Sequence, residues 1–197
     1  MKGKPLHWLA PTSLLAWMLL AGCNTTPELR NRPGFLSSYD HLRQVDDMTW
    51  RYVNPVLLGQ CKKLIIPEVQ ILSSEFQGKP VTEEDRRRSA KFVRDAMILA
   101  LADRYTVVTE PAPDVCELRI AVTDAYGKGG KLGLSVEGEI LDHSKTQVTA
   151  VMRTEMSERY VADWEDRPTA RKMVEAWARR VRKTMDDAHA ANRAASN

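Results

Sequence analysis

Three consecutive stretches of alternating apolar and polar residues most constrain the fold of this 197-residue chain. The clearest is residues 115–126, where Cys116, Leu118, Ile120 and Val122 would point to one side of a strand. Two similar stretches follow at residues 132–140 and 148–156, separated by the short breaks 127–130 and 142–145. Strands this close in sequence pair most simply with their neighbours, so we expect an antiparallel meander.

Two helical patterns and two shorter strands flank the meander. Thr82 is placed to cap a helix of about residues 82–104, which has acidic residues in its first turn and an apolar stripe at helical spacing. A final helix is expected from Asp166, with Pro168 in its first turn. Residues 61–72, interrupted by Pro67, and 105–110 read as strands. The order predicts an α+β fold: a largely antiparallel sheet of about five strands with two helices on one face.

The composition supports a single domain. Charged residues make up 28% of the chain and hydrophobic residues 43%, which excludes collagen, a mostly disordered chain and a disulfide-dense miniprotein. Residues 24–33 are polar with two prolines and predict a tether. Residues 34–55 carry Phe35, Tyr39, Trp50 and Tyr52, and predict an irregular segment wrapped onto the domain. We therefore expect one domain at 34–190 and a frayed tail at 191–197.

The first 22 residues have the layout of a secretory signal peptide. Lys2 and Lys4 precede the apolar run at residues 14–21, which is far too short to span a bilayer as a helix. The alternatives are an N-terminal helix buried in a core and an anchor that stays uncleaved. The motif Leu20-Ala21-Gly22-Cys23 resembles the lipobox of bacterial lipoproteins, which implies cleavage between Gly22 and Cys23 and a lipid on Cys23.

A lipidated Cys23 would attach the chain to a membrane. By the resemblance, this cysteine carries several acyl chains, and several chains together hold firmly because each buried methylene contributes about 0.8 kcal/mol. Asn24 follows the cysteine instead of the aspartate that signals inner-membrane retention in enteric bacteria. We therefore expect a periplasmic domain on the outer membrane, tethered by residues 23–33.

The charge of the exported chain argues against nucleic acid as a partner. Cleavage after Gly22 removes Lys2 and Lys4 and no acidic residue, so the formal net charge falls from +3 to +1. Nucleic-acid binding would require a strong basic footprint.

Two cysteines remain after Cys23. In an oxidising compartment Cys61 and Cys116 are candidates for one disulfide, closing a loop of about 55 residues. The alternative is two buried free thiols that pack as small hydrophobic groups.

Several motifs spread over the exported part of the chain resemble one family. They are the segment Gly34-Phe35-Leu36-Ser37-Ser38-Tyr39, the segment Arg51-Tyr52-Val53-Asn54-Pro55, Lys62-Lys63-Leu64, Leu118-Arg119-Ile120-Ala121-Val122-Thr123-Asp124 and Trp177-Ala178. They are similar to a bacterial lipoprotein family known only as domain of unknown function 3313. The resemblance spans roughly residues 34–190 and implies an envelope lipoprotein with an α+β domain. It brings no established activity and no catalytic residues.

No catalytic or metal-binding pattern stands out. The stretch Gly127-Lys128-Gly129-Gly130-Lys131 lacks the spacing of a phosphate-binding loop and predicts a hairpin turn. His41, His143 and His189 are scattered, and no nucleophile motif is present. Asp163, Glu165 and Asp166 are better explained by helix capping and solvation than by a cation site. We therefore expect no catalytic residues, no metal and no cofactor.

Two groups of residues are candidates for a binding surface. The aromatic group, Phe35, Tyr39, Trp50 and Tyr52, could line a groove for a peptide or glycan, or form a flap over the core. The basic group, Arg179, Arg180, Arg182 and Lys183, could meet anionic lipid headgroups or cell-wall polymer, or form an ordinary solvated helix face.

Together these observations predict a lipid-anchored, non-enzymatic binding or accessory factor of the cell envelope. Its partners would be the membrane through Cys23, and an envelope protein or a cell-wall polymer. The alternatives are an enzyme that modifies envelope polymers through a site assembled from scattered residues, and a purely structural spacer.

Overall fold

The meander predicted from the alternating residues forms the centre of the sheet. The computed structural model describes residues 34–76, 79–128, 131–160 and 167–195, and its longest strands are β8 (Val115–Lys128), β9 (Lys131–Leu141) and β10 (Gln147–Tyr160). Both neighbouring pairs are antiparallel, with Arg119 opposite Glu139 and Glu139 opposite Ala150. Pairing of β8 with β9 continues to Lys128 and Lys131, as expected for a hairpin at residues 127–131.

The sheet is larger and more mixed than the five largely antiparallel strands expected. Within the described residues eight strands form one sheet, in the order β1-β2-β10-β9-β8-β3-β7 with β4 also beside β8. β3 (Lys63–Ile65) is parallel to β8 and to β7 (Thr106–Val107), and β4 (Gln70–Ile71) is parallel to β8. The parallel pairs arise because the helix α2 (Glu83–Leu101) connects these strands, and a helical crossover returns the chain in the same direction.

The two predicted strands at residues 61–72 and 105–110 are shorter than expected, and the second is reduced to β7. Residues 61–72 form β3 and β4 with Pro67 between them, because proline has no N–H to contribute to a ladder. A small separate pair, β5 (Glu75–Phe76) and β6 (Lys79–Pro80), leads from β4 to α2.

The expected irregular segment at residues 34–55 contains a hairpin that was not predicted. β1 (Arg43–Asp46) pairs with β2 (Thr49–Val53), and β2 extends the sheet beside β10. All four residues of β1 are exposed, so the strand carries no apolar alternation that would reveal it. Charged residues on an exposed edge strand also discourage pairing with another chain.

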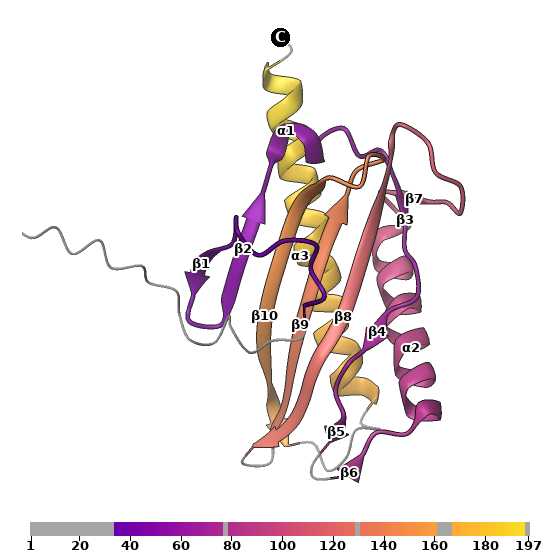
Figure 1. Cartoon of the computed structure of the whole chain (residues 1–197), viewed down its shortest axis with the longest axis vertical. Coiled ribbons are helices and arrows are strands. Elements are labelled where there is room, and N and C mark those ends of the chain that lie inside the picture. The colour runs from indigo at the N-terminus through magenta and orange to yellow at the C-terminus, as the bar shows by residue number, and fades with distance from the viewer. Residues whose placement is uncertain (1–33, 77–78, 129–130, 161–166, 196–197) are drawn as a thin grey trace, which may run out of the picture. The chain divides into compact units, whose positions relative to one another are not determined.

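The main helices α2 and α3 (Arg167–Ala195) lie side by side on one face of the sheet, as predicted (Figure 1). α2 begins at a capping box in which Thr82 Oγ1 accepts from the Asp85 N–H and the Asp85 carboxylate accepts from the Thr82 N–H. The expected N-cap of α3, Asp166, lies outside the described residues. None of the described helices is long and apolar enough to cross a membrane.

The helix α3 continues past Ala190 to Ala195. The short helix α1 (Pro55–Leu58) packs there, and Asn192 Nδ2 donates a hydrogen bond to the Val56 carbonyl at 3.0 Å. His189 also contacts the Cys61 carbonyl oxygen through Nε2 at 2.9 Å. The sequence pattern did not predict these two contacts of α3.

Candidate functional site

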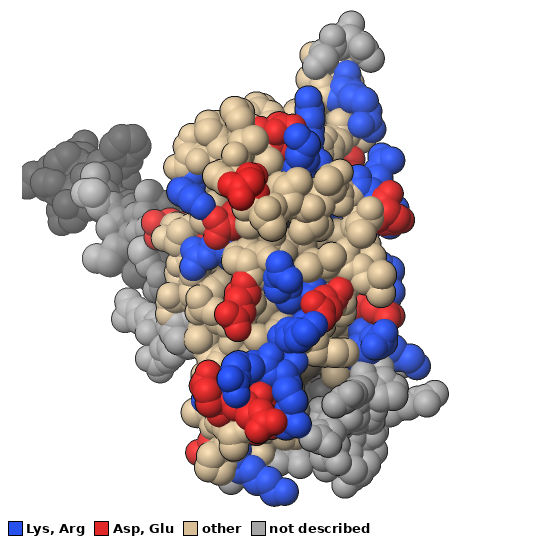
Figure 2. All heavy atoms as spheres, turned by 90° about the vertical axis from the view of Figure 1, so that its right-hand side faces the viewer, with Lys and Arg blue, Asp and Glu red and all other residues tan. Residues whose placement is uncertain are grey.

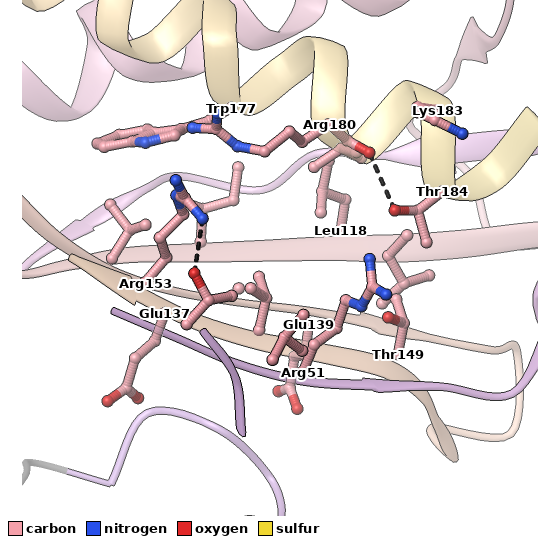
Figure 3. A pocket seen from close by; sticks show the side chains of 18 of the residues that line it. Arg51, Leu118, Glu137, Glu139, Thr149, Arg153, Trp177, Arg180, Lys183 and Thr184 are labelled. Atoms are coloured by element: carbon pink, nitrogen blue, oxygen red, sulfur yellow. Dashed lines mark hydrogen bonds between the residues drawn. The ribbon is translucent and has the colours of Figure 1, made fainter. Parts of the chain in front are cut away.

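A pocket of about 480 Å³ opens between α3 and the sheet (Figure 3). Leu118 on β8, Ile140 on β9 and Thr149 on β10 are paired across the strands, and all three line the pocket. This pairing places the pocket on the helix-covered face of the sheet. Trp177, Arg180, Val181, Lys183, Thr184 and Asp187 of α3 form the opposite wall.

The floor of the pocket is apolar. We use the term floor for all apolar lining residues, which include Trp177 and Val181 of the α3 wall together with Met97, Leu118, Ile120, Val136, Ile140 and Val151. Gly138 lies in the middle of this floor on β9, and a Cβ built there would meet Val151 Cγ1 and the Arg119 carbonyl oxygen at 3.6 Å. That distance is ordinary van der Waals contact. Glycine at this strand position therefore leaves space that a side chain could fill.

Four basic side chains surround the floor: Arg51 of β2, Arg153 of β10, and Arg180 and Lys183 of α3. Figure 3 shows Arg51 and Arg153 extending from the sheet toward α3. Glu137 and Glu139 also contribute to the lining, but their side chains extend to the other side of the sheet. The four basic side chains therefore face the pocket together with the carboxylates of Asp46 and Asp187, which also line it.

We call these four basic side chains the rim of the pocket. Three of them are paired with carboxylates. Arg153 Nε lies 2.9 Å from Glu155 Oε1, and Arg180 pairs with the same carboxylate oxygen. Arg153 Nη1 is also 3.6 Å from Asp46 Oδ2, and Lys183 Nζ is 2.7 Å from Asp187 Oδ2. Two guanidinium groups thus share one carboxylate at the edge of the pocket.

Arg180 is partly desolvated at this position. Burial lowers the pKa of its guanidinium, the Glu155 carboxylate opposes that effect, and the neighbouring Arg153 reinforces it.

Two polar groups of the pocket have no partner among the described residues. The Arg51 side chain is exposed and makes no hydrogen bond or ion pair with them. Trp177 is only 5% exposed, yet its Nε1–H has no hydrogen-bond acceptor there. A buried donor without an acceptor costs free energy, so a ligand or water that supplies an oxygen would be stabilised at the indole.

The opposite face of the sheet is covered by residues 34–42, which we call the N-terminal flap. Figure 1 shows this segment crossing the sheet on the side away from α2 and α3. Beneath it Glu139, 1% exposed, accepts hydrogen bonds from Arg119, Gln147, the Ser37 hydroxyl and the Ser37 N–H. These contacts neutralise and solvate a carboxylate that would otherwise be costly to bury.

Tyr39 forms the second fastening of the N-terminal flap. Its hydroxyl donates to Glu137 Oε2 at 2.6 Å and accepts from the N–H groups of Phe35 and Leu36 at 3.0 and 3.3 Å. Burial and then the hydrogen bond to Glu137 raise the pKa of Tyr39 to about 12.

The candidate aromatic residues form a cover and not an open groove. Phe35 is buried with the Arg119 guanidinium 5.0 Å from its ring centroid, and Trp50 is buried on β2. The Tyr52 ring lies 5.0 Å from the His41 ring, and Tyr39 is fastened to Glu137. These contacts favour the core-flap alternative.

The candidate basic residues of α3 divide into two groups. Arg180 and Lys183 line the pocket. Arg182 Nη1 instead donates to both carboxylate oxygens of Asp103, each at 2.8 Å. Arg179 is exposed and has no partner among the described residues. On the face of the molecule shown in Figure 2, basic and acidic side chains lie next to one another. Because Arg182 pairs with Asp103 and Lys183 with Asp187, the face of α3 is not a uniform basic patch.

Cys61 and Cys116 form a disulfide with 5.4 Å between their Cα atoms. Both cysteines are buried at the start of the parallel pair β3 and β8, where Leu64 is opposite Cys116. The structure thus contains the disulfide and not the alternative of two free thiols. Gly22, Cys23 and the acidic group Asp163, Glu165 and Asp166 lie outside the described residues, as do residues 24–33 of the tether.

Sequence reasoning did not identify Arg51, Arg153, Gly138 or Trp177 as parts of one site. Arg153 shares a face of β10 with Thr149 and Val151 and could have signalled a polar group on the helix-covered face. Arg51 could not be placed because β2 was not predicted as a strand. Within the described residues, no three His, Cys, Asp or Glu side chains gather as metal ligands would.

Comparisons with known proteins identify a family but no activity. No curated protein matches the chain in sequence. The PelC dodecamer from Paraburkholderia phytofirmans is 11% identical, with a TM-score of 0.45, 70% of this chain covered and 95% of that chain. An uncharacterised protein of known structure is 14% identical, with a TM-score of 0.36 and coverage of 72% and 95%. A family model described as "Protein of unknown function (DUF3313)" matches residues 31–133, more than half of the chain, and the chain therefore belongs to this family.

Proposed function

We propose that this chain is a lipid-anchored protein of the bacterial envelope, held on the outer membrane and facing the periplasm. Its folded domain acts as a non-enzymatic binding or accessory factor. The observation that carries the binding role is the pocket between α3 and the sheet, which combines an apolar floor with a basic rim. Ligand sites are typically concave and mostly apolar, with a few polar groups that orient the ligand.

Two features of the chain support the envelope location. The motif Leu20-Ala21-Gly22-Cys23 follows a short apolar run. The remaining cysteines, Cys61 and Cys116, are joined in a disulfide, and disulfides persist mainly in oxidising compartments such as the periplasm. An anchor would confine the domain to a surface and raise its effective concentration toward partners there.

The anchor is tested by the variant Cys23→Ala. We expect it to take up no labelled palmitate and to accumulate as an uncleaved or soluble species. The matched control is Cys61→Ala with Cys116→Ala, which removes the other two cysteines and should still incorporate the label. Wild-type fractionation and labelling of Cys23→Ala would overturn the proposed anchor.

The binding role is tested by crosslinking in cells from two exposed positions. A photoreactive amino acid replaces Val45, which lines the pocket and is 54% exposed, or Leu99, which is 73% exposed on α2 and does not line the pocket. We expect one dominant adduct, identified by mass spectrometry, from position 45 and none from position 99. Equal adduct patterns from the two positions would argue against binding at this pocket.

A further inference from the structure

We propose that the pocket between α3 and the sheet binds a single-chain amphiphile with one acidic headgroup. The acyl chain would lie on the apolar floor and the headgroup at the basic rim. This inference rests on the proposed binding role of the same pocket and names the class of ligand. Three features of the pocket support it, namely its floor, its charge and an unpaired buried donor.

The floor matches an alkyl chain. Its residues are aliphatic except for Met97 and Trp177, and they come from α2, α3, β8, β9 and β10. Gly138 keeps the middle of the floor open, and glycine inside a strand often marks a place where a ligand approaches closely. A volume of about 480 Å³ is within the usual range of small-molecule pockets.

The charge of the rim favours an anionic ligand. The four cations Arg51, Arg153, Arg180 and Lys183 face three carboxylates, those of Asp46, Glu155 and Asp187. One positive charge is therefore left over, and Arg51 is the cation that has no partner among the described residues. A carboxylate or phosphate headgroup near Arg51 would form a charge-assisted hydrogen bond at the mouth of the pocket.

The indole of Trp177 adds a polar requirement within the apolar wall. Its Nε1–H is buried and lacks an acceptor among the described residues. A purely hydrocarbon ligand would leave this donor unsatisfied. A ligand that carries an oxygen atom within reach of the indole would satisfy this donor, which an alkane cannot do.

The test is photolabelling of the full-length chain in phosphatidylcholine nanodiscs. The probe is a fatty acid with a diazirine in its acyl chain, and the labelled peptides are mapped by mass spectrometry. We expect labels in β8, β9 and α3. Laurate and dodecyl phosphate should both compete, and neutral monolaurin should compete about tenfold less well. Competition by only one of the two anions would identify the headgroup.

Two variants separate the rim from the floor. Arg51→Glu should weaken labelling about tenfold, whereas the matched charge reversal Arg179→Glu, outside the pocket, should not change it. Gly138→Leu should fill the floor and abolish labelling. Gly138→Ala, whose Cβ fits at 3.6 Å, controls for folding, which is checked by thermal melting.

The result can contradict this inference without contradicting the proposed function. Labels outside the pocket, equal competition by monolaurin, or labelling unaffected by both Arg51→Glu and Gly138→Leu would overturn the amphiphile. An adduct from position 45 in cells would then still support binding of another ligand. If the Cys23→Ala experiment contradicted the proposed anchor, the outcome of the nanodisc labelling would still test the amphiphile independently.

Discussion

At the scale of single residues, buried polar groups hold the N-terminal flap on the sheet. Glu139 satisfies its carboxylate with Arg119, Gln147 and Ser37, and Tyr39 bridges Glu137 and the backbone of the flap. Removing one partner from such a network costs more than the mean value of a hydrogen bond, because the other partner stays buried and unsatisfied.

We expect Tyr39→Phe to loosen the flap and to destabilise the domain by about 1–3 kcal/mol. The phenylalanine keeps the ring but removes the donor to Glu137 and the acceptor for the Phe35 and Leu36 N–H groups. Hydrogen exchange should increase at residues 34–42, and chemical denaturation should give the loss of stability. In the control Tyr52→Phe, whose hydroxyl makes no hydrogen bond to the described residues, both should stay unchanged.

The raised pKa of Tyr39 predicts an alkaline transition. The folded pKa is about 12 against an ordinary value of 10.0, so the folded state holds this proton more tightly than the unfolded state. Its contribution to stability is complete below about pH 10 and is lost as the pH rises through 12. Tyrosinate absorbance should show a step near pH 12 that is missing from Tyr39→Phe. A step near pH 10 assigned to Tyr39 would contradict the buried hydrogen bond.

At the scale of elements, periodicity predicted the parts of the fold that bury one clear face. Apolar and polar residues alternate along β8, β9 and β10, and α2 has a cap at Thr82 and an apolar stripe. The meander and this helix could therefore be predicted from the sequence. The hairpin of β1 and β2 was not, because β1 is exposed along its whole length. The parallel partners of β8 depend on long-range pairing across α2, which no local pattern encodes.

The same limit applies to the pocket. Its lining comes from five strands and two helices, so its residues are adjacent only after the sheet has formed. The sequence singled out Arg180 and Lys183 as part of a basic helix but could not pair them with Arg51 and Arg153. Only the tertiary register shows that these cations share one cavity.

The contact between α1 and α3 depends on a glycine. A Cβ on Gly59 would lie 2.2 Å from Asn192 Nδ2 and 2.9 Å from the Ala188 carbonyl oxygen. The φ of −68° at Gly59 suits alanine, so the conflict is one of space and not of backbone conformation. We expect Gly59→Ala to destabilise the domain by about 1–3 kcal/mol in urea unfolding.

A matched control comes from Gly138, a glycine in the strand β9. Gly138→Ala places its Cβ 3.6 Å from its nearest neighbours and should leave stability nearly unchanged. Adding Asn192→Ala to Gly59→Ala should recover part of the loss, since it removes the closer of the two conflicts. Equal stability of Gly59→Ala and Gly138→Ala would contradict the close approach of α1 and α3.

At the scale of the whole molecule, the disulfide ties the two halves of the sheet together. Cys61 precedes β3 and Cys116 lies at the start of β8, 55 positions further along the chain, and the segment between them includes α2. The bond therefore spans the connection that produces the parallel strands. Both sulfur atoms belong to the core that the sheet shares with the helices.

We expect reduction of this disulfide to lower the free energy of unfolding by about 4 kcal/mol, because the unfolded chain then regains the freedom of a long loop. The measurement is urea unfolding of the Cys23→Ala chain with and without reductant, so that only Cys61 and Cys116 remain as cysteines. The control adds Cys61→Ala and Cys116→Ala, and its stability should not respond to reductant. Two free thiols counted in the unfolded, unreduced Cys23→Ala chain would show that the bond does not form, and the stability of the domain would then have to come from its core alone.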